Sequence, residues 1–329
     1  DLNMHKIDYL ARQAREQHRV LLRADIDFAN AFNSVSHGAL WAVLEGFRVP
    51  DVDWLKQLYA KLTVRLKGEA DVGSSMVLNT GVAQGHVLSP FLFILFVNAL
   101  SRYLTAVGSK NGIEHGIRGV RGWNHTLFCD DLTLFAQTEA GMQTLLEAVS
   151  VFEDWSGLPV KLKKCCVMRV GGQHSEECKN PQIKYRGWTL RVVDDDEEVR
   201  HLGFWTTPNG DWKGMVDRVH VSTLEAINIV KHSAKVVSPS AGVTLFNSLA
   251  VSVFRYSAAF IPWGRHDLGV DTLPAQLDKI GHLWCQGFSS AWDLPAGTAH
   301  DLFTFPSEQG GMGYLQPVEV MTEAILQHI

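Results

Sequence analysis

The chain has 329 residues, of which 46% are hydrophobic and 20% are charged, and its formal net charge is −5. These proportions are typical of a folded globular protein and exclude a disordered or fibrous chain, and the length predicts two or three packed units. The longest apolar run, Phe91–Val97, is too short to span a bilayer, so we expect no membrane segment. The acidic balance does not favour nucleic-acid binding, so such a function needs a local site.

The first residues and the cysteines predict where the chain works. The sequence begins with Asp1 and carries no apolar secretory signal, so we expect an internal part of a longer polypeptide. The five cysteines show no C-x-x-C pair, which predicts reduced thiols in an intracellular compartment and argues against a zinc site.

The N-terminal half predicts mixed helices and strands. A polar helix reaches about Gln17, and the branched segment Val20–Asp27 predicts a buried strand that ends on an acid. Five further features follow: helices at His37–Phe47 and Trp54–Leu62, a polar turn at Gly68–Ser75, a short strand at Met76–Asn79, and a buried helix over Phe91–Leu104 that begins at Pro90.

The second half begins with a predicted hairpin whose tip carries two acids. The β-prone segments His125–Cys129 and Leu132–Phe135 flank Asp130 and Asp131. A helix over Ala140–Ser156 should end at Gly157, and residues 183–193 and 199–206 should form another hairpin around the acidic run Asp194–Glu198. From Met215 the pattern is helical to about Pro262, which predicts a separate all-α domain with a boundary near residue 214, and Val318–Ile329 predicts a last helix.

Three acids at strand ends could carry chemistry. Carboxylates held about 4 Å apart repel by roughly 4 kcal/mol per pair at an effective dielectric near 20, so Asp27, Asp130 and Asp131 would need a cation or protons. Carboxylate oxygens suit Mg²⁺, and two such ions can stabilise the entering and leaving oxygens of a phosphoryl transfer. The alternative is that Asp27 caps the next turn and the pair is a polar hairpin turn.

The order of the surrounding motifs resembles the reverse transcriptase domain of non-LTR (LINE-type) retrotransposons. The matching segments are Ile26–His37 around the first acid, Asn79–Phe93 with Gly81-Val82-Ala83-Gln84-Gly85 and Leu88-Ser89-Pro90, Phe128–Asp131, Ser156–Lys164, His201-Leu202-Gly203, and Phe305-Pro306 with Gly310–Gly313. Three positions depart from the usual pattern: Asn33, Cys129 and Lys161 stand where aspartate, alanine and asparagine are common.

The resemblance implies a catalytic role for several residues. Asp27, Asp130 and Asp131 would bind two Mg²⁺ ions, or Mn²⁺ in their place, together with the main-chain carbonyl of Phe28. Lys164 would lie near the pyrophosphate leaving group. The alternative for Lys164 is a solvated strand edge shared with Lys161 and Lys163.

The resemblance also implies residues that contact the substrates. Phe32 would lie under the incoming sugar and exclude a 2′-hydroxyl, although an ordinary core aromatic is the alternative for that ring. Gln84 and Gly85 would support the templating pair, Cys129 would lie beside the primer end, and His201-Leu202-Gly203 would form the primer grip.

The implied fold is α+β, a right-hand polymerase palm whose antiparallel sheet has helices on one face, followed by an all-α thumb. Residues 1–214 would be the palm with partial fingers, 215–300 the thumb and 301–329 a truncated connector. The function implied is an RNA-directed DNA polymerase that uses an RNA template, a DNA primer and dNTPs in the nucleus and cytoplasm. The remaining fingers strands and an endonuclease would belong to upstream segments of the parent polypeptide, so we expect weak activity from these residues by themselves.

Two alternatives remain open. One is a catalytically inactive, reverse-transcriptase-like scaffold that binds nucleic acid. The acidic balance and the missing fingers strands favour a loss of activity, whereas the complete set of metal ligands argues against it. The other is an RNA-dependent RNA polymerase, which Phe32 disfavours because that class generally carries an acid at this position.

Overall fold

The structure is a computed structural model, and it describes residues 2–67, 72–83, 85–111, 113, 123–172, 180–233, 235–258, 261 and 273–291. The chain divides into two compact units. One unit runs from Lys6 to Asp195, and the other contains Asp1–His5 together with Asp196–Ile329.

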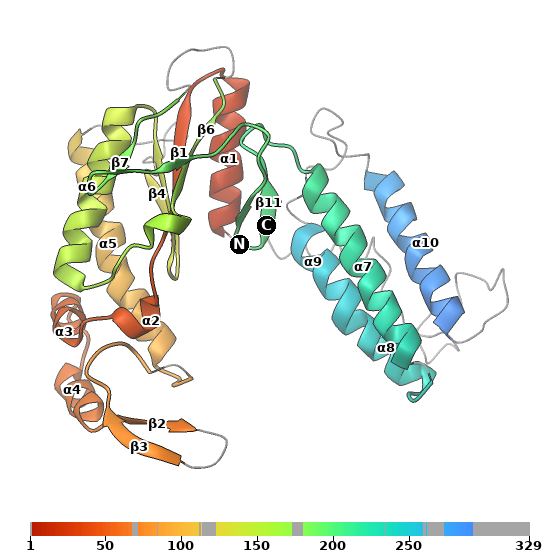
Figure 1. Cartoon of the computed structure of the whole chain (residues 1–329), viewed down its shortest axis with the longest axis horizontal. Coiled ribbons are helices and arrows are strands. Elements are labelled where there is room, and N and C mark those ends of the chain that lie inside the picture. The colour runs from red at the N-terminus through yellow and green to blue at the C-terminus, as the bar shows by residue number, and fades with distance from the viewer. Residues whose placement is uncertain are drawn as a thin grey trace. The chain divides into compact units, whose positions relative to one another are not determined.

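The first unit contains a five-stranded sheet, two separate two-stranded hairpins and the helices that pack around them (Figure 1). Its helices are α1 (Leu2–Glu16), α2 (Ala31–Ser34), α3 (His37–Gly46), α4 (Val52–Ala60), α5 (Ser89–Asn111), α6 (Glu139–Ser156) and the 3₁₀ turn η1 (Leu162–Lys164). Its strands are β1 (Leu21–Asp27), β2 (Thr63–Lys67), β3 (Val72–Val77), β4 (His125–Phe128), β5 (Asp131–Ala136), β6 (Cys166–Val170), β7 (Lys184–Tyr185), β8 (Trp188–Thr189) and β9 (Arg191–Val192).

The five-stranded sheet has the order β4-β5-β1-β6-β9, so β1 lies at its centre. Strand β1 pairs antiparallel with both β5 and β6, whereas β6 and β9 pair in parallel. Helices α5 and α6 lie on one side of the sheet (Figure 1), and alternate β1 residues such as Leu22, Ala24 and Ile26 are buried in the core that these helices complete. The other β1 face therefore carries Arg23, Asp25 and Asp27.

Helix α5 is the most apolar helix of the core. Its length and composition alone would allow it to cross a membrane. However, Leu92, Phe93, Phe96, Leu100 and Leu104 are buried in the same cluster as the sheet residues, so α5 is a core helix of this unit.

The second unit joins a short hairpin to a group of helices. These elements are β10 (Val199–His201), β11 (Phe204–Thr206), α7 (Lys213–Ser233), α8 (Pro239–Phe246), the π-helical turn η2 (Asn247–Val251), α9 (Ser252–Ala258) and α10 (Leu273–Ala291). Helices α7 and α10 pack closely, because a Cβ at Gly287 would come within 2.5 Å of Ile227. The Trp284 ring makes edge contacts with Phe246 and Phe254 and closes this core.

Most predicted elements are present, and Gly157 ends α6 in the left-handed conformation, with φ 73°. Two predictions were wrong. The polar turn expected at Gly68–Ser75 overlaps β3, which pairs with the unexpected strand β2. Residues 183–193 and 199–206 do not pair with each other. Instead β7 pairs with β8, β9 joins the main sheet, and β10 pairs with β11.

The predicted domain boundaries are not tested by this division. The compact units divide between Asp195 and Asp196, whereas the helical run begins with α7 at Lys213, near the predicted boundary at residue 214. The predicted connector at 301–329, with its expected helix Val318–Ile329, lies outside the described residues.

Candidate active site

Asp27, the last residue of β1, lies directly opposite Asp131, the first residue of β5. The Asp27 carbonyl accepts a hydrogen bond from the Lys161 N–H at 2.7 Å on the other edge of β1. Asp27 and Asp131 are therefore a pair without mutual backbone hydrogen bonds, which is the kind whose side chains come closest and share one face of the sheet. Partial burial and the negative charges of Asp130 and Asp27 raise the pKa of Asp131.

Lys164 brings a positive charge to these acids. Its ammonium nitrogen lies 3.5 Å from a carboxylate oxygen of Asp27, and 59% of its side chain is exposed. Lys164 ends the short turn η1, which contacts β1. The structure therefore brings Asp27, Asp131 and Lys164 together, and their predicted catalytic roles stay predictions.

The hairpin between β4 and β5 positions the third acid. Phe128 pairs with Asp131, so Cys129 and Asp130 form the two-residue turn. Cys129 has φ 53°, a left-handed conformation that costs a non-glycine residue on the order of 1 kcal/mol. Burial, followed by the charges of Asp130 and Asp131, raises the pKa of the Cys129 thiol, so the thiol stays protonated at neutral pH.

Asp25 lies two residues before Asp27 on the same face of β1, and it was not predicted as a site residue. Its carboxylate accepts two hydrogen bonds from the buried Arg23 guanidinium, at 2.9 and 2.8 Å, and one from the Thr133 hydroxyl at 2.9 Å. Asp25 is thus neutralised within the sheet, whereas Asp27 and Asp131 face solvent. The signal in the sequence that could have identified Asp25 is the alternation of charged and apolar residues along β1.

The Phe28 carbonyl, the predicted main-chain metal ligand, is placed by the same strand. Ala29 N–H donates to the Pro159 carbonyl at 2.7 Å, so Asp27 and Ala29 direct their peptide groups toward residues 159–161. Peptide groups of successive strand residues point to opposite edges, and the Phe28 carbonyl therefore faces the side on which β5 and Asp131 lie.

The loop predicted to support the templating pair is held against α2. Gly81 N–H donates to the Val35 carbonyl and Val82 N–H donates to the Phe32 carbonyl, both at 2.7 Å. A Cβ at Gly81, where φ is +84°, would lie 2.7 Å from the Asn33 Cα. This close contact leaves no room for a side chain and explains why residue 81 is a glycine.

Gly85 and Gln84, which follow in this loop, were predicted to support the templating pair. Gly85 has φ +83° and open space around it, and Gln84 lies outside the described residues. Their assignment to the templating pair stays a prediction.

Phe32, the predicted sugar-contacting ring, is half-buried and stacks on Phe93 of α5 with a centroid separation of 4.4 Å. The ring is therefore fixed from one side by the core. Its contact with a sugar stays a prediction.

The predicted primer-grip residues lie in the second compact unit. Leu202 and Gly203, with φ 47° and 86°, form the turn of the β10–β11 hairpin, and His201 is buried beside it. The Tyr256 hydroxyl donates to the Leu202 carbonyl, and its ring stacks on Phe204 at 5.0 Å. The turn is rigidly supported, and its role as a primer grip stays a prediction.

The acids suit a divalent cation by donor type and charge. Within the described part of the chain, no three His, Cys, Asp or Glu side chains converge closely enough to hold a metal ion. The available donors are nevertheless all oxygens, which Mg²⁺ prefers, and repulsion by Asp130 and Asp27 adds to burial in raising the pKa of Asp131. A bound cation would relieve that repulsion.

Comparisons with known proteins agree with this arrangement. Residues 3–205 match the family model described as "Reverse transcriptase (RNA-dependent DNA polymerase)". The Pol polyprotein of the type-2 retrotransposable element R2DM of Drosophila melanogaster is 32% identical over 210 residues, which are 62% of this chain and 19% of that protein. The Pol polyprotein of the type-1 element R2 of Nasonia vitripennis is 27% identical over 319 residues, which are 94% of this chain and 29% of that protein.

The chain thus spans less than a third of the length of these curated relatives. Among solved structures, apo telomerase from Candida Tropicalis is 10% identical, with a TM-score of 0.48 over 88% of this chain and 50% of that one. The sheet that carries Asp27, Asp130 and Asp131 is a polymerase palm followed by helices, as the sequence predicts, with β9 as one parallel strand. With the family model matched across the whole of that sheet, this chain belongs to the reverse transcriptase family, in its non-LTR retrotransposon branch.

Proposed function

We propose that this chain carries out RNA-templated DNA synthesis, in which a DNA primer 3′-hydroxyl attacks a dNTP. The observation that carries the proposal is the direct opposition of Asp27 and Asp131 in the palm sheet, with Lys164 beside them. The family match supports the reaction type.

Asp27, Asp130, Asp131 and the Phe28 carbonyl would hold Mg²⁺ or Mn²⁺. Two such ions supply charge stabilisation for the attacking and leaving oxygens when they are bound. The chain's own contribution is placement: paired strands β1 and β5 fix two carboxylates on one face, and the third, Asp130, is the turn residue that precedes Asp131.

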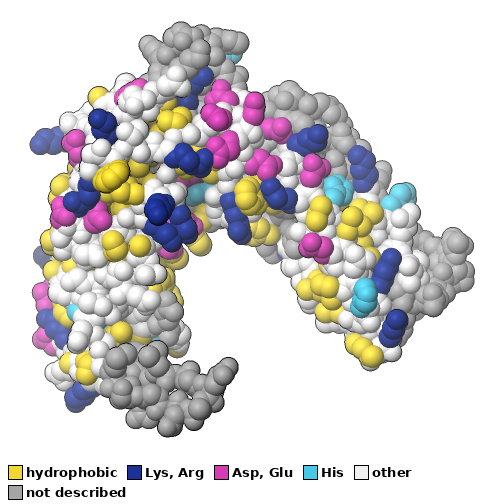
Figure 2. All heavy atoms as spheres, viewed as in Figure 1, with side chains coloured by type: hydrophobic (Ala, Val, Ile, Leu, Met, Phe, Trp, Pro, Cys, Tyr) yellow, Lys and Arg dark blue, Asp and Glu magenta, His cyan; other side chains and the backbone are white. Residues whose placement is uncertain are grey.

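Lys164 would serve the leaving group. Its ammonium lies next to Asp27 and is largely exposed, so it can approach a pyrophosphate bound over the carboxylates. Exposed Lys161 and Lys163 on the same turn add positive charge around it. Figure 2 shows basic and acidic side chains interspersed on the visible face, so the positive charge available to a phosphate-bearing substrate is local to this turn.

Phe32 would select the sugar. Its ring is held by Phe93, so it resists displacement by a 2′-hydroxyl, and deoxynucleotides are the preferred substrates. The nucleic-acid partners would be an RNA template and a DNA primer, and the work would be intracellular.

The test is primer extension with dNTPs on matched RNA and DNA templates, with Mg²⁺, Mn²⁺ or EDTA. We expect extension on RNA that requires the divalent ion and stops in EDTA. Binding of the primer–template without extension in either metal would instead identify an inactive scaffold. Preference for ribonucleotides would identify an RNA polymerase.

A further inference from the structure

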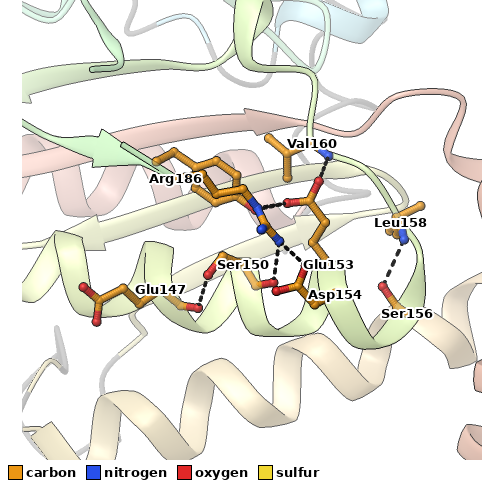
Figure 3. A network of polar contacts seen from close by, with 9 residues as sticks. Glu147, Ser150, Glu153, Asp154, Ser156, Leu158, Val160 and Arg186 are labelled. Carbon is orange, nitrogen blue, oxygen red and sulfur yellow. Dashed lines mark hydrogen bonds and ion pairs between the residues drawn. The ribbon is translucent and has the colours of Figure 1, made fainter. Parts of the chain in front are cut away.

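Glu153, near the end of α6, uses both of its carboxylate oxygens in a network of polar contacts (Figure 3). One oxygen accepts a hydrogen bond from the Val160 N–H at 3.0 Å. The other accepts from the Tyr185 hydroxyl at 2.6 Å and from the Arg186 guanidinium at 2.9 Å. Only 18% of the Glu153 side chain is exposed, so its bonds with Val160 and Tyr185 are partly shielded from water, whereas 40% of the Arg186 side chain is exposed.

Val160 belongs to the segment that holds the end of β1. It lies opposite Phe28 in an isolated antiparallel bridge. On either side of it, the Pro159 carbonyl accepts from Ala29 and the Lys161 N–H donates to the Asp27 carbonyl, both at 2.7 Å. A shift of Val160 would therefore move the backbone of Asp27.

The same segment leads directly into the turn that carries Lys164. Residues 162–164 form η1, and the Lys164 N–H donates to the Lys161 carbonyl at 2.9 Å. Segment 159–164 thus determines both the backbone of Asp27 and the ammonium that lies 3.5 Å from its carboxylate.

The residues that precede this segment make a second hydrogen bond to the end of α6. The fully buried Ser156 hydroxyl accepts from the Leu158 N–H at 3.2 Å (Figure 3), and Gly157 takes the left-handed conformation. Leu158 and Val160 are therefore both fixed to the end of α6, one by Ser156 and the other by Glu153.

We propose that Glu153 is a positioning residue for catalysis, which holds Asp27 and Lys164 in register through the Val160 amide. This inference rests on the proposed function. Without the carboxylate, the Val160 N–H loses its acceptor and segment 159–164 loosens. Misplacement of reacting groups by about 1 Å can cost on the order of a hundredfold in rate, so the loss should appear in kcat.

Asp154 provides a matched control on the adjacent residue. Both Glu153 and Asp154 bind Arg186, which also donates to the Ser150 carbonyl at 3.1 Å (Figure 3). The Val160 N–H donates to Glu153. Asp154 instead contacts Arg186, and 69% of its side chain is exposed. Removing Asp154 weakens the anchor on the β7–β8 turn and leaves the tie to Val160 in place.

The experiment compares Glu153→Ala, Glu153→Gln and Asp154→Ala by single-nucleotide extension and by amide hydrogen exchange. We expect Glu153→Ala to lower kcat at least tenfold with the KM for dNTP within threefold, and to speed exchange in residues 158–164. Glu153→Gln keeps an oxygen for the Val160 N–H, so it should restore most of kcat. Asp154→Ala should match the parent chain in both measurements.

Equal kcat values for Glu153→Ala and Asp154→Ala would overturn the proposal, and so would a slow Glu153→Ala with unchanged exchange in 158–164. The exchange arm does not depend on catalysis. If the parent chain extended no primer, faster exchange confined to 158–164 in Glu153→Ala would still confirm the tie, and the proposed function would fail separately.

Discussion

The carboxylates of Asp27 and Asp131 project from directly opposed positions of β1 and β5, so the palm sheet places two like charges against each other. Such a pair is destabilising by about 0.2–1 kcal/mol relative to neutral partners. A divalent cation would turn this repulsion into attraction, so folding and metal binding should be linked.

We expect Asp131→Asn to raise the melting temperature in EDTA by roughly 1–3 °C, because the repulsion with Asp27 is removed. Mg²⁺ or Mn²⁺ should then raise the melting temperature of the parent chain more than that of the variant, since a cation that binds the folded state stabilises it. Differential scanning fluorimetry with and without each ion checks this. Identical metal-induced shifts in both proteins would count against Asp131 as a ligand.

Asp27→Asn and Asp130→Asn should each abolish primer extension while leaving primer–template affinity within about threefold. Each change removes a metal-binding carboxylate and leaves the rest of the nucleic-acid surface intact. The assay is single-turnover extension beside a filter-binding titration. Asp53→Asn on α4, whose side chain is 89% exposed, is the control that should extend at the parent rate. Near-normal extension by either site variant would remove that aspartate from the mechanism.

Phe32→Ala should raise the incorporation of ribonucleotides relative to deoxynucleotides by tenfold or more, because the ring would no longer occupy the space beneath the 2′ position. The Phe93 ring remains buried in the core, so the site should keep its fold. A competition assay with mixed dNTP and rNTP gives the ratio. An unchanged ratio would leave Phe32 as a packing residue on Phe93.

Gly81→Ala should destabilise the first unit by on the order of 3 kcal/mol. The new methyl group would lie 2.7 Å from the Asn33 Cα, and the alanine would also hold a positive φ. Gly85→Ala is the matched variant, because it has a similar φ and open space, and it should cost about 1 kcal/mol. Urea unfolding of both proteins measures the difference, and equal losses would show that the contact with Asn33 relaxes freely.

The stability of the first unit should fall as the pH drops from about 6.5 toward 4. Burial, and then the nearby Lys6 charge, lower the pKa of His125 to about 4. Its ring lies between the Asn124 amide oxygen at 2.6 Å and the Ser101 hydroxyl at 2.7 Å. Between these pH values His125 binds a proton in the unfolded chain but stays neutral in the folded chain. Acidification therefore lowers the free energy of unfolding, by at most about 3 kcal/mol.

His125→Gln should flatten this part of the pH profile of the unfolding free energy, whereas His232→Gln, at an exposed ring on α7, should leave it in place. Urea unfolding at pH 7 and pH 4.5 gives the comparison. A His125→Gln variant that loses as much stability on acidification as the parent chain would assign the loss to other groups.

Local patterns in the sequence were sufficient to predict much of the palm. The branched residues of Val20–Asp27 predict a strand, and the β-prone segments His125–Cys129 and Leu132–Phe135 predict a hairpin with Asp130 and Asp131 at its tip. The structure has this hairpin with Cys129 and Asp130 as its turn and Asp131 as the first residue of β5. Gly157 predicts the end of α6. In each case the residues that decide the structure are neighbours along the chain.

The failures concern contacts between distant residues. Nothing local shows that Arg191 and Val192 pair with β6 rather than continue into a hairpin with residues 199–206, because that choice depends on the free edge of β6. Val72–Ser75, the first residues of β3, were predicted as part of a polar turn, and pairing with β2 overrides that propensity. The hydrogen bond from Arg186 to Glu153 likewise joins residues that are far apart in the sequence.

The central place of β1 in the sheet has a consequence for synthesis of the protein. Leu21–Asp27 leaves the ribosome before both of its partner strands, which end at Ala136 and Val170. Until β6 emerges, the strand that ends in Asp27 has an open edge able to recruit strands of other nascent chains. A product truncated between β5 and β6 would therefore aggregate rather than compete for templates as a soluble inactive copy.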